Sequence, residues 1–314
     1  MPRNVDRAAG VARQRKAMLK LFRGRRSAVV FLTCCVLALS ACGGGGGGGG
    51  GGSFAGIAIA AGAGGGAAPA SPAPTPAPPT SASRTVTASV ASTQVGYAYP
   101  LSIYLPPGYD GSSARYPVIY ALDGDATNGQ STTRFVNLRT ILQTVGTSAI
   151  LVGVGGTERR QTDYNLPGAT AFHAFFANAL IPFIEANYRA DPARRMLTGL
   201  STGGNFPLIE FLTQAPDAFL FKVYHSVDAA FWQQESQLYA LEASAYARVA
   251  DRPLPVMLIL DSSSSGNTQY VETMARQIAS RNYRELQLLH TVYSESHVQS
   301  DLPSFEAAVR RAFP

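Results

Sequence analysis

Residues 194–211 read RRMLTGLSTGGNFPLIEF and combine a strand, a turn and a helix in one short stretch. The segment RRMLTG is typical of a short strand, and NFPLIEFL has the apolar spacing of a helix. Between them, residues 199–203 form a G-x-S-x-G string. Gly199 and Gly203 carry no Cβ, so a strand and a helix can approach closely around a strained turn. The stretch therefore predicts that Ser201 is exposed at a strand–turn–helix junction.

The predicted helix after Ser201 points its positive N-terminal end at the turn. A nucleophilic serine needs donors for the oxyanion, and the Thr202 amide is one candidate. Pro207 lies inside the same helix, where proline costs about 3 kcal/mol and introduces a kink. We therefore expect a bent helix or compensation by tertiary packing.

The rest of the domain alternates apolar strands with helices, and this pattern predicts the fold class. It favours an α/β fold with a mostly parallel sheet that is covered by helices on both faces and has no large lid domain. Sites in such sheets form beyond the carboxyl ends of the strands, where residues 123–125, Ser201 and the stretch with His297 are expected. Strands are predicted at residues 85–90, 99–106, 117–125, 149–156, 194–199, 218–226, 254–260 and 286–293, and helices at 132–145, 172–188, 237–248, 270–281 and 303–313.

Four histidines are candidates for the general base. His173 and His290 fall within an apolar helix and an apolar strand, which favours structural roles. His225 follows a strand and could line the cleft. His297 lies in the polar loop YSESHVQSD before the last helix, which matches the order serine, acid, histidine of α/β-hydrolases. His297 is therefore the predicted base.

The sequence offers several candidates for the acid of the predicted triad. The usual position follows the strand before the histidine strand, and Asp261 is the only carboxylate there before Glu272. Its role would be to orient and stabilise the imidazolium. Asp261 is the first choice, and Glu272, Glu295 or a Ser–His dyad are the alternatives.

The amino-terminal segment has the pattern of an export signal. Residues 1–26 are basic and polar, and SAVVFLTCCVLALSAC follows as an apolar run. This order is typical of a secretion signal, and the run is shorter than the roughly 18 residues of a membrane-spanning helix. Its last four residues resemble the lipobox of bacterial lipoproteins, which implies lipidation of Cys42. A plain signal peptide or an uncleaved anchor are the alternatives.

The lipobox resemblance also implies a location and a domain plan. Gly43 follows the cysteine where Asp would favour the inner membrane, so the resemblance implies an exported protein anchored in the outer membrane, with its domain in the periplasm or at the surface. Residues 43–83 are rich in Gly, Ala and Pro and predict a disordered tether. Residues 84–314 are long enough for one domain with a full core.

Charge and composition exclude several classes of function for the domain. Residues 1–42 hold nine of the 26 Lys and Arg residues but one of the 20 Asp and Glu residues. The remaining 17 basic and 19 acidic residues leave no basic footprint for nucleic acid. All three cysteines lie at or before Cys42, and the histidines lack metal-binding spacing, so we expect no metal and no cofactor.

Five segments together resemble the Putative esterase family of α/β-hydrolases, which includes enterochelin-esterase-like and esterase-D-like proteins and has the mycolyltransferases as relatives. The resemblance covers nearly all of residues 92–314, and IPFIEANYRADPARRMLTGLSTGG is its most specific part. The segments are YLPPGYDGSSARYPVIYALDGD, GTERRQTDYNLPG, FFANALIPFIEANYRADPARRMLTGLSTGG, VDAAFWQQ and YSESH.

The resemblance implies roles for individual residues. Ser201 would be the nucleophile and His297 the base, and the Asp125 amide would join that of Thr202 in the oxyanion hole. Two departures are visible: Leu200 stands where the family often has His, and residues 262–264 lack the family's acid motif. The residues implied at the pocket are Asp123, Gly124, Arg160, Asp163, Tyr164, Asp228 and Trp232.

The resulting hypothesis is a serine carboxylic-ester hydrolase that acts through an acyl-enzyme on Ser201. The expected substrate is a small-molecule or glycan-linked ester. An acyltransferase on the same scaffold differs only in the acceptor of the acyl group. A surface-anchored binding protein with weakened catalysis is the alternative from another class, and the missing acid motif favours it.

Overall fold

The computed structural model describes residues 82–249 and 251–314. The predicted signal, Cys42 and nearly all of the predicted tether lie outside these residues. The described strands form one sheet in the order β1-β2-β4-β3-β5-β6-β7-β8, with β9 paired to β7. The strands are β1 (Arg84–Ser92), β2 (Tyr97–Leu105), β3 (Tyr116–Ala121), β4 (Ile150–Val154), β5 (Ala190–Leu200), β6 (Val223–Val227), β7 (Met257–Ser263), β8 (Gln287–Leu289) and β9 (Val292–Tyr293).

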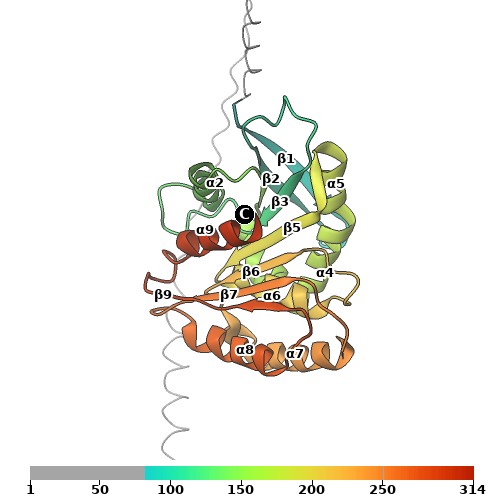
Figure 1. Ribbon diagram of the computed structural model, residues 1–314, viewed down its shortest axis with the longest axis vertical. Helices are drawn as coiled ribbons and strands as arrows, with labels where there is room; N and C mark the ends of the chain where they lie inside the picture. Colours follow the sequence, from blue (N-terminus) through green and yellow to red (C-terminus); the bar gives the residue numbers. More distant parts are fainter. Residues whose placement is uncertain (1–81, 250) are drawn as a thin grey trace, which may run out of the picture. The chain divides into compact units, whose positions relative to one another are not determined.

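Strands β3 to β9 run parallel, whereas β1 and β2 pair antiparallel at one edge. Helices α2 (Arg134–Val145) and α9 (Asp301–Ala312) lie on one face of the sheet (Figure 1). The other face carries α4 (Gly168–Phe175), the π-helical turn η2 (Phe176–Leu180), α5 (Ile181–Asn187), α6 (Thr202–Thr213), α7 (Glu235–Val249) and α8 (Thr268–Ser280). Short turns of helix complete the order: η1 (Thr157–Arg159), α3 (Arg160–Asp163) and η3 (Phe231–Gln233).

The core consists of two apolar layers, because the central strands are buried on both faces. In β3, Val118 and Tyr120 belong to the layer under α4–α8, whereas Ile119 and Ala121 belong to the layer under α2 and α9. Such strands read as continuous apolar runs rather than as alternating ones. The predicted fold class is confirmed, and no separate lid domain interrupts the described elements.

Several predicted elements differ from the structure in their bounds, and two differ in more than their bounds. The predicted helix 172–188 begins at Gly168 and contains the π-helical turn η2. By length and composition, residues 168–187 could cross a membrane, but Phe172, Phe175 and Phe176 are fully buried in the core of this domain. The predicted strand 286–293 is split into β8 and β9, because the Thr291 amide donates to the Asp261 carboxylate (3.0 Å) instead of a ladder partner.

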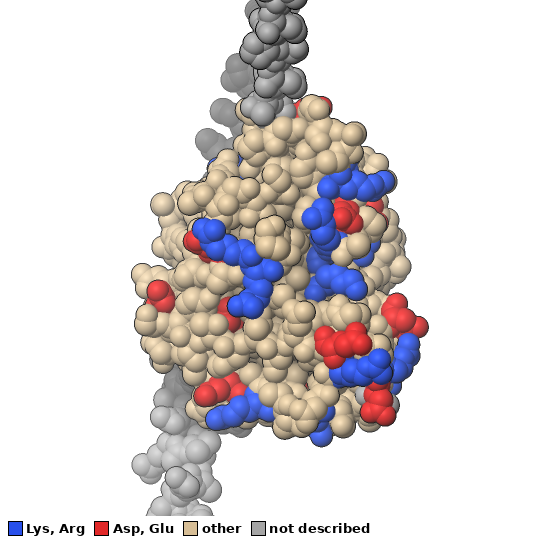
Figure 2. Space-filling model, viewed as in Figure 1, with Lys and Arg blue, Asp and Glu red and all other residues tan. Residues whose placement is uncertain are grey.

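Charged side chains on the surface form small groups of mixed sign. Figure 2 shows Lys and Arg beside Asp and Glu on one face of the molecule. Surface ion pairs of the described residues include Arg194 with Asp191 and Arg310 with Glu306. Exposed pairs of this kind contribute little to stability.

Candidate active site

Ser201 occupies the turn between β5 and α6, as the sequence predicts. Its backbone has φ 61° and ψ −125°, a conformation that residues other than glycine rarely adopt. Three backbone hydrogen bonds hold it: Ser201 N donates to Val227 O (2.9 Å), and Ser201 O accepts from Gly204 N (2.9 Å) and Ala230 N (3.1 Å). The surrounding strands and helix thus maintain a strained turn that presents the serine side chain.

The two glycines of the motif are required by space. A Cβ on Gly199 would lie 2.0 Å from Gly203 O, and a Cβ on Gly203 would lie 2.8 Å from Asp123 Oδ2. Helix α6 continues through the buried Pro207. Proline lacks the N–H that would bond Gly203 O within the helix, so this carbonyl is left to face Gly199. Pro207 and its neighbours Phe206 and Leu208 are buried in the core, so tertiary packing surrounds the proline.

His297 lies in the loop before α9 and contacts Asp228. Its Nδ1 is 2.5 Å from Asp228 Oδ2. The Asp228 side chain is fully buried, and about a third of the His297 side chain is exposed. With Nδ1 engaged by a carboxylate, Nε2 is the ring nitrogen left for proton transfer.

Asp228 follows β6 at φ 39°, and its carboxylate crosses to the loop after β7. Its Oδ1 accepts hydrogen bonds from the amides of Ser263 and Asn267, both at 2.9 Å. A Cβ on Gly266 would lie 1.9 Å from Asp228 Oδ2. The serine-rich loop after β7 therefore receives the carboxylate of the neighbouring strand.

Asp261, the predicted acid, lies elsewhere. Its carboxylate accepts hydrogen bonds from Ser304 Oγ (2.7 Å) and Thr291 N (3.0 Å), and it forms no hydrogen bond with His297 among the described residues. Strand alternation explains this position, because Asp261 shares the α9 face with Ile259. The sequence placed Asp228 at the pocket but missed its contact with His297; the available signal was a carboxylate directly after a strand.

The two alternative acids also lie away from His297. Glu272 is on α8, with its carboxylate 3.9 Å from Arg276 at the surface. The Glu295 side chain is exposed, and its only hydrogen bond within the described residues is a long one to Ser294 Oγ (3.5 Å). The structure therefore brings Asp228 to His297, and none of Asp261, Glu272 and Glu295.

The backbone amides of Asp125 and Thr202 have no hydrogen-bond acceptor within the described residues. Gly124 N, in contrast, donates to Val154 O (2.8 Å). The Asp125 side chain is also engaged, because its Oδ2 accepts from Gly156 N (2.9 Å). The amides that the sequence predicts for the oxyanion hole are thus free to donate.

The Ser201 hydroxyl forms no hydrogen bond with His297 among the described residues. Such bonds are often long in free enzymes and shorten when substrate binds. Ser201 follows β5, and His297 follows β9, so both lie at the carboxyl edge of the sheet.

Arg160 and Tyr164 contact the segments around the Ser201 turn, whereas the buried Asp163 contacts Tyr99 and Arg159. Arg160 Nη2 donates to Leu200 O (3.1 Å) and lies 2.9 Å from Asp123 Oδ2. Tyr164 Oη accepts from Asp123 N (3.4 Å), and Asp163 accepts from Tyr99 Oη (2.5 Å). Burial raises the pKa of Asp123 to about 6, although Arg160 opposes this shift.

Side-chain amides contact Thr202, the residue after Ser201. Gln233 Nε2 and Gln161 Nε2 donate to Thr202 Oγ1 at 3.1 Å and 3.4 Å. The Trp232 side chain next to Gln233 is exposed on η3. These groups form the polar surface that adjoins Ser201.

The other histidines have structural partners. His173 Nδ1 lies 3.0 Å from both carboxylate oxygens of the buried Glu210, and His225 is enclosed between Thr198 and Ser304. His290 is 3.4 Å from Ser262 Oγ. Within residues 82–249 and 251–314, no three His, Cys, Asp or Glu side chains are grouped to bind a metal ion.

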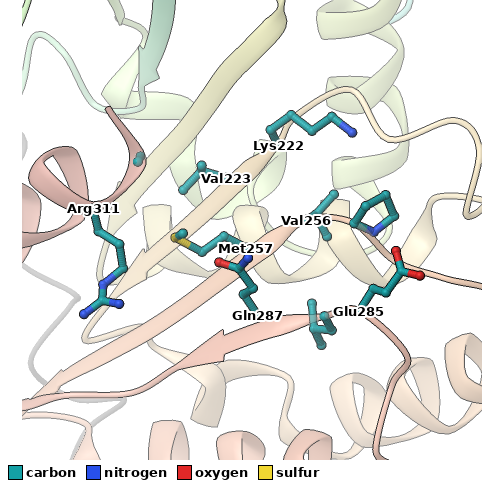
Figure 3. Close-up of a pocket in the computed structure, with 10 residues that line it drawn as sticks. Lys222, Val223, Val256, Met257, Glu285, Gln287 and Arg311 are labelled. Carbon is teal, nitrogen blue, oxygen red and sulfur yellow. The ribbon is translucent and has the colours of Figure 1, made fainter. Parts of the chain in front are cut away.

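A groove of about 620 Å³ lies at the opposite edge of the sheet. Figure 3 shows Val223, Met257 and Gln287 in it, which are the first residues of β6, β7 and β8, together with Lys222 and Arg311. None of the residues at the Ser201 turn lines this groove. Its size therefore does not identify it as the reaction site.

A family model described as Putative esterase matches residues 92–306. The chain belongs to this family. It is an esterase with the α/β-hydrolase fold, as the resemblance in its sequence implies. Comparison of the esterase with curated protein sequences finds no match.

Solved structures with the same fold include three proteins from different organisms. The esterase is 22% identical to an IroE-like serine hydrolase from Shewanella oneidensis, with a TM-score of 0.63 over 73% of this chain and 80% of that one. It is also 22% identical to the BES protein from Bacillus cereus, with a TM-score of 0.61 over 73% of this chain and 95% of that one. It is 17% identical to the siderophore hydrolase EstA from Aspergillus nidulans, with a TM-score of 0.60 over 72% of this chain and 93% of that one. At these identities the likeness shows a shared fold.

Proposed function

We propose that the protein is a serine carboxylic-ester hydrolase that acts through an acyl-enzyme on Ser201. The observation that carries the proposal is the His297–Asp228 contact at the same sheet edge as the strained Ser201 turn. In this arrangement Asp228 orients the imidazole and stabilises its charged form. His297 Nε2 then serves as the base for the Ser201 hydroxyl.

The reaction proceeds in two halves. Ser201 Oγ attacks the ester carbonyl while His297 accepts its proton, and the amides of Asp125 and Thr202 donate to the oxyanion. Collapse of the tetrahedral intermediate breaks the ester C–O bond, and His297 returns the proton to the leaving alcohol. Water, activated by His297, then attacks the acyl-Ser201 and releases the carboxylic acid.

The substrate that we propose is a small-molecule or glycan-linked carboxylic ester. The siderophore hydrolase among the structural relatives supports inclusion of siderophore esters in a substrate survey. The polar groups of Gln161, Gln233 and Thr202 support a substrate with hydrogen-bonding groups near the scissile bond.

Labelling with a fluorophosphonate tests the assignment of the nucleophile. We expect one label per chain, on the peptide that contains Ser201, because only an activated serine reacts rapidly with such a reagent. Mass spectrometry of the digested protein locates the label, and heat-denatured protein is the control that should remain unlabelled. Labelling of a different serine in the folded protein would contradict the proposed mechanism.

We further propose that the protein is attached to the outer membrane through a lipid on Cys42, with its domain in the periplasm or at the surface. The support is the LSAC sequence after the apolar run. Radiolabelled palmitate should enter the wild-type protein and not Cys42→Ala, and the variant should leave the membrane fraction. Cys35→Ala is the matched control and should keep the label. Equal labelling of Cys42→Ala would contradict the proposal.

A further inference from the structure

Arg134 is a buried cation at the start of α2, with only 2% of its surface exposed. Its Nε and Nη2 donate to the two carboxylate oxygens of Asp301 at 2.7 Å and 2.8 Å. Burial disfavours the charged form, yet Asp301 raises the pKa of Arg134 above its ordinary value. Buried ion pairs often stabilise a fold no better than apolar residues of the same volume, so stability alone does not account for this pair.

The Arg134 side of the pair is attached to the oxyanion segment. Arg134 Nη1 donates to Leu122 O (2.9 Å), and Arg134 N donates to Ala126 O (2.7 Å). These two carbonyls flank Asp125, whose amide is one of the two proposed oxyanion donors. The position of that amide therefore depends on the start of α2.

The Asp301 side is attached to the loop that carries His297. Asp301 is the first residue of α9, and the preceding Ser300 donates through its Oγ to His297 O (3.1 Å). Ser300 N also donates to Ser296 O (2.9 Å). The ion pair between Arg134 and Asp301, which are 167 residues apart in the sequence, thus joins the oxyanion segment to the His297 loop.

A chain of buried hydrogen bonds continues from Arg134 beneath the site. The directions are consistent from cation to carboxylate, because Ser304 Oγ donates to Asp261 and must therefore accept from His225 Nε2. Thr198 Oγ1, which accepts from Arg134 Nη2, can in turn donate to His225 Nδ1. The links are Arg134 Nη2 to Thr198 Oγ1 (3.3 Å), Thr198 Oγ1 to His225 Nδ1 (2.9 Å), His225 Nε2 to Ser304 Oγ (2.8 Å) and Ser304 Oγ to Asp261 Oδ2 (2.7 Å).

This chain reaches the strands that carry the other reacting groups. Thr198 lies on β5 three residues before Ser201, and His225 lies on β6 three residues before Asp228. Asp261 O also accepts from Asp228 N (2.7 Å). The network therefore contacts the strand or loop of every group in the proposed mechanism.

We propose that Arg134 is a positioning residue that sets the oxyanion segment against the His297 loop, through its pair with Asp301 and the chain that ends at Asp261. The inference rests on the proposed function. Small displacements at a reacting centre reduce turnover steeply, so loss of this connection should affect turnover more than stability.

The double variant Arg134→Met with Asp301→Leu removes the pair and keeps the volume. Titration with a fluorophosphonate counts the reactive serines, so kcat can be expressed per reactive serine. We expect this kcat to fall at least about tenfold in the double variant, whereas its KM should stay within about twofold of the wild-type value. A boronic acid, which forms a tetrahedral adduct that needs the oxyanion donors, should bind about tenfold more weakly as well. The melting temperature should stay within about 5 °C of wild type.

Two further variants make the test decisive. Arg134→Lys keeps the charge but cannot form the two-pronged hydrogen bond with Asp301, so its kcat per titrated serine should also fall. This variant supplies the test if the double variant does not fold. Glu242→Gln is the matched control, because Glu242 is a buried partner of Arg281 between α7 and α8 (3.1 Å). It should lower the melting temperature and leave kcat per titrated serine unchanged.

The outcomes separate this inference from the proposed function. If the wild-type protein hydrolyses p-nitrophenyl esters and both Arg134 variants keep its kcat per titrated serine, the positioning role is overturned and the esterase mechanism stands. If the wild-type protein is neither titrated nor active, the proposed function itself fails. A fall in kcat that is matched by Glu242→Gln would also overturn the inference, because it would reflect general loss of stability.

Discussion

Replacement of Ser201 by alanine is expected to lower kcat for p-nitrophenyl acetate hydrolysis by about 10⁴- to 10⁶-fold. The variant keeps the turn, the free amides and the His297–Asp228 pair but has no nucleophile. The residual rate would come from the oxyanion donors and from substrate binding. Initial rates of p-nitrophenolate release by purified protein provide the measurement.

Ser244→Ala is a matched control for this experiment. Ser244 is exposed on α7, and its hydroxyl donates to Ala240 O (2.8 Å), so its loss should not change the rate. Equal hydrolysis by wild type and Ser201→Ala would remove Ser201 from the mechanism and would favour a binding protein on the same scaffold.

Replacement of Asp228 by asparagine is expected to cost about 10⁴-fold in kcat. The amide has nearly the same shape as the carboxylate, but it does not stabilise the imidazolium and it favours the wrong tautomer of His297. Asp261→Asn should cost about tenfold or less, because Asp261 bonds Ser304 and Thr291 rather than the base. Glu272→Gln should leave the rate unchanged, since Glu272 lies on the surface of α8.

A substitution at Gly266 tests the position of Asp228 without changing the charge of its side chain. Gly266→Ala should lower kcat, because the new Cβ would lie 1.9 Å from Asp228 Oδ2 and displace it from His297. Gly111→Ala is the control, since the nearest atom to its Cβ would be 4.0 Å away. A larger loss in Asp261→Asn than in Asp228→Asn would reverse the assignment of the acid.

The strained turn at Ser201 and the parallel sheet could be predicted because their signals are local. The G-x-S-x-G string that marks the Ser201 turn lies within residues 199–203, and each buried strand can be recognised from its own apolar run. The choice between Asp228 and Asp261 depends instead on which side of the sheet each carboxylate faces and on how the next loop receives it. That information lies in packing between β6, β7 and α9, which no single segment contains.

Sequence patterns could not predict the split of strand 286–293 into β8 and β9, or the Arg134 network, for the same reason. Arg134 reads as an ordinary polar residue at the start of an amphipathic helix. Only the fold brings Asp301 to it, 167 residues later, and encloses both. Buried polar networks of this kind connect residues that share no spacing rule.

The antiparallel edge of the sheet determines where an upstream attachment meets the domain. Arg84 pairs with Leu105, and the adjacent Tyr104 pairs with Leu151 near the beginning of β4. Arg84 is therefore level with the amino ends of the parallel strands, whereas Ser201 follows the carboxyl end of β5. If the protein is immobilised on a bead or vesicle through its N-terminus, the attachment enters the domain at the sheet edge opposite Ser201. The edge that carries Ser201 then stays open to substrate from solution.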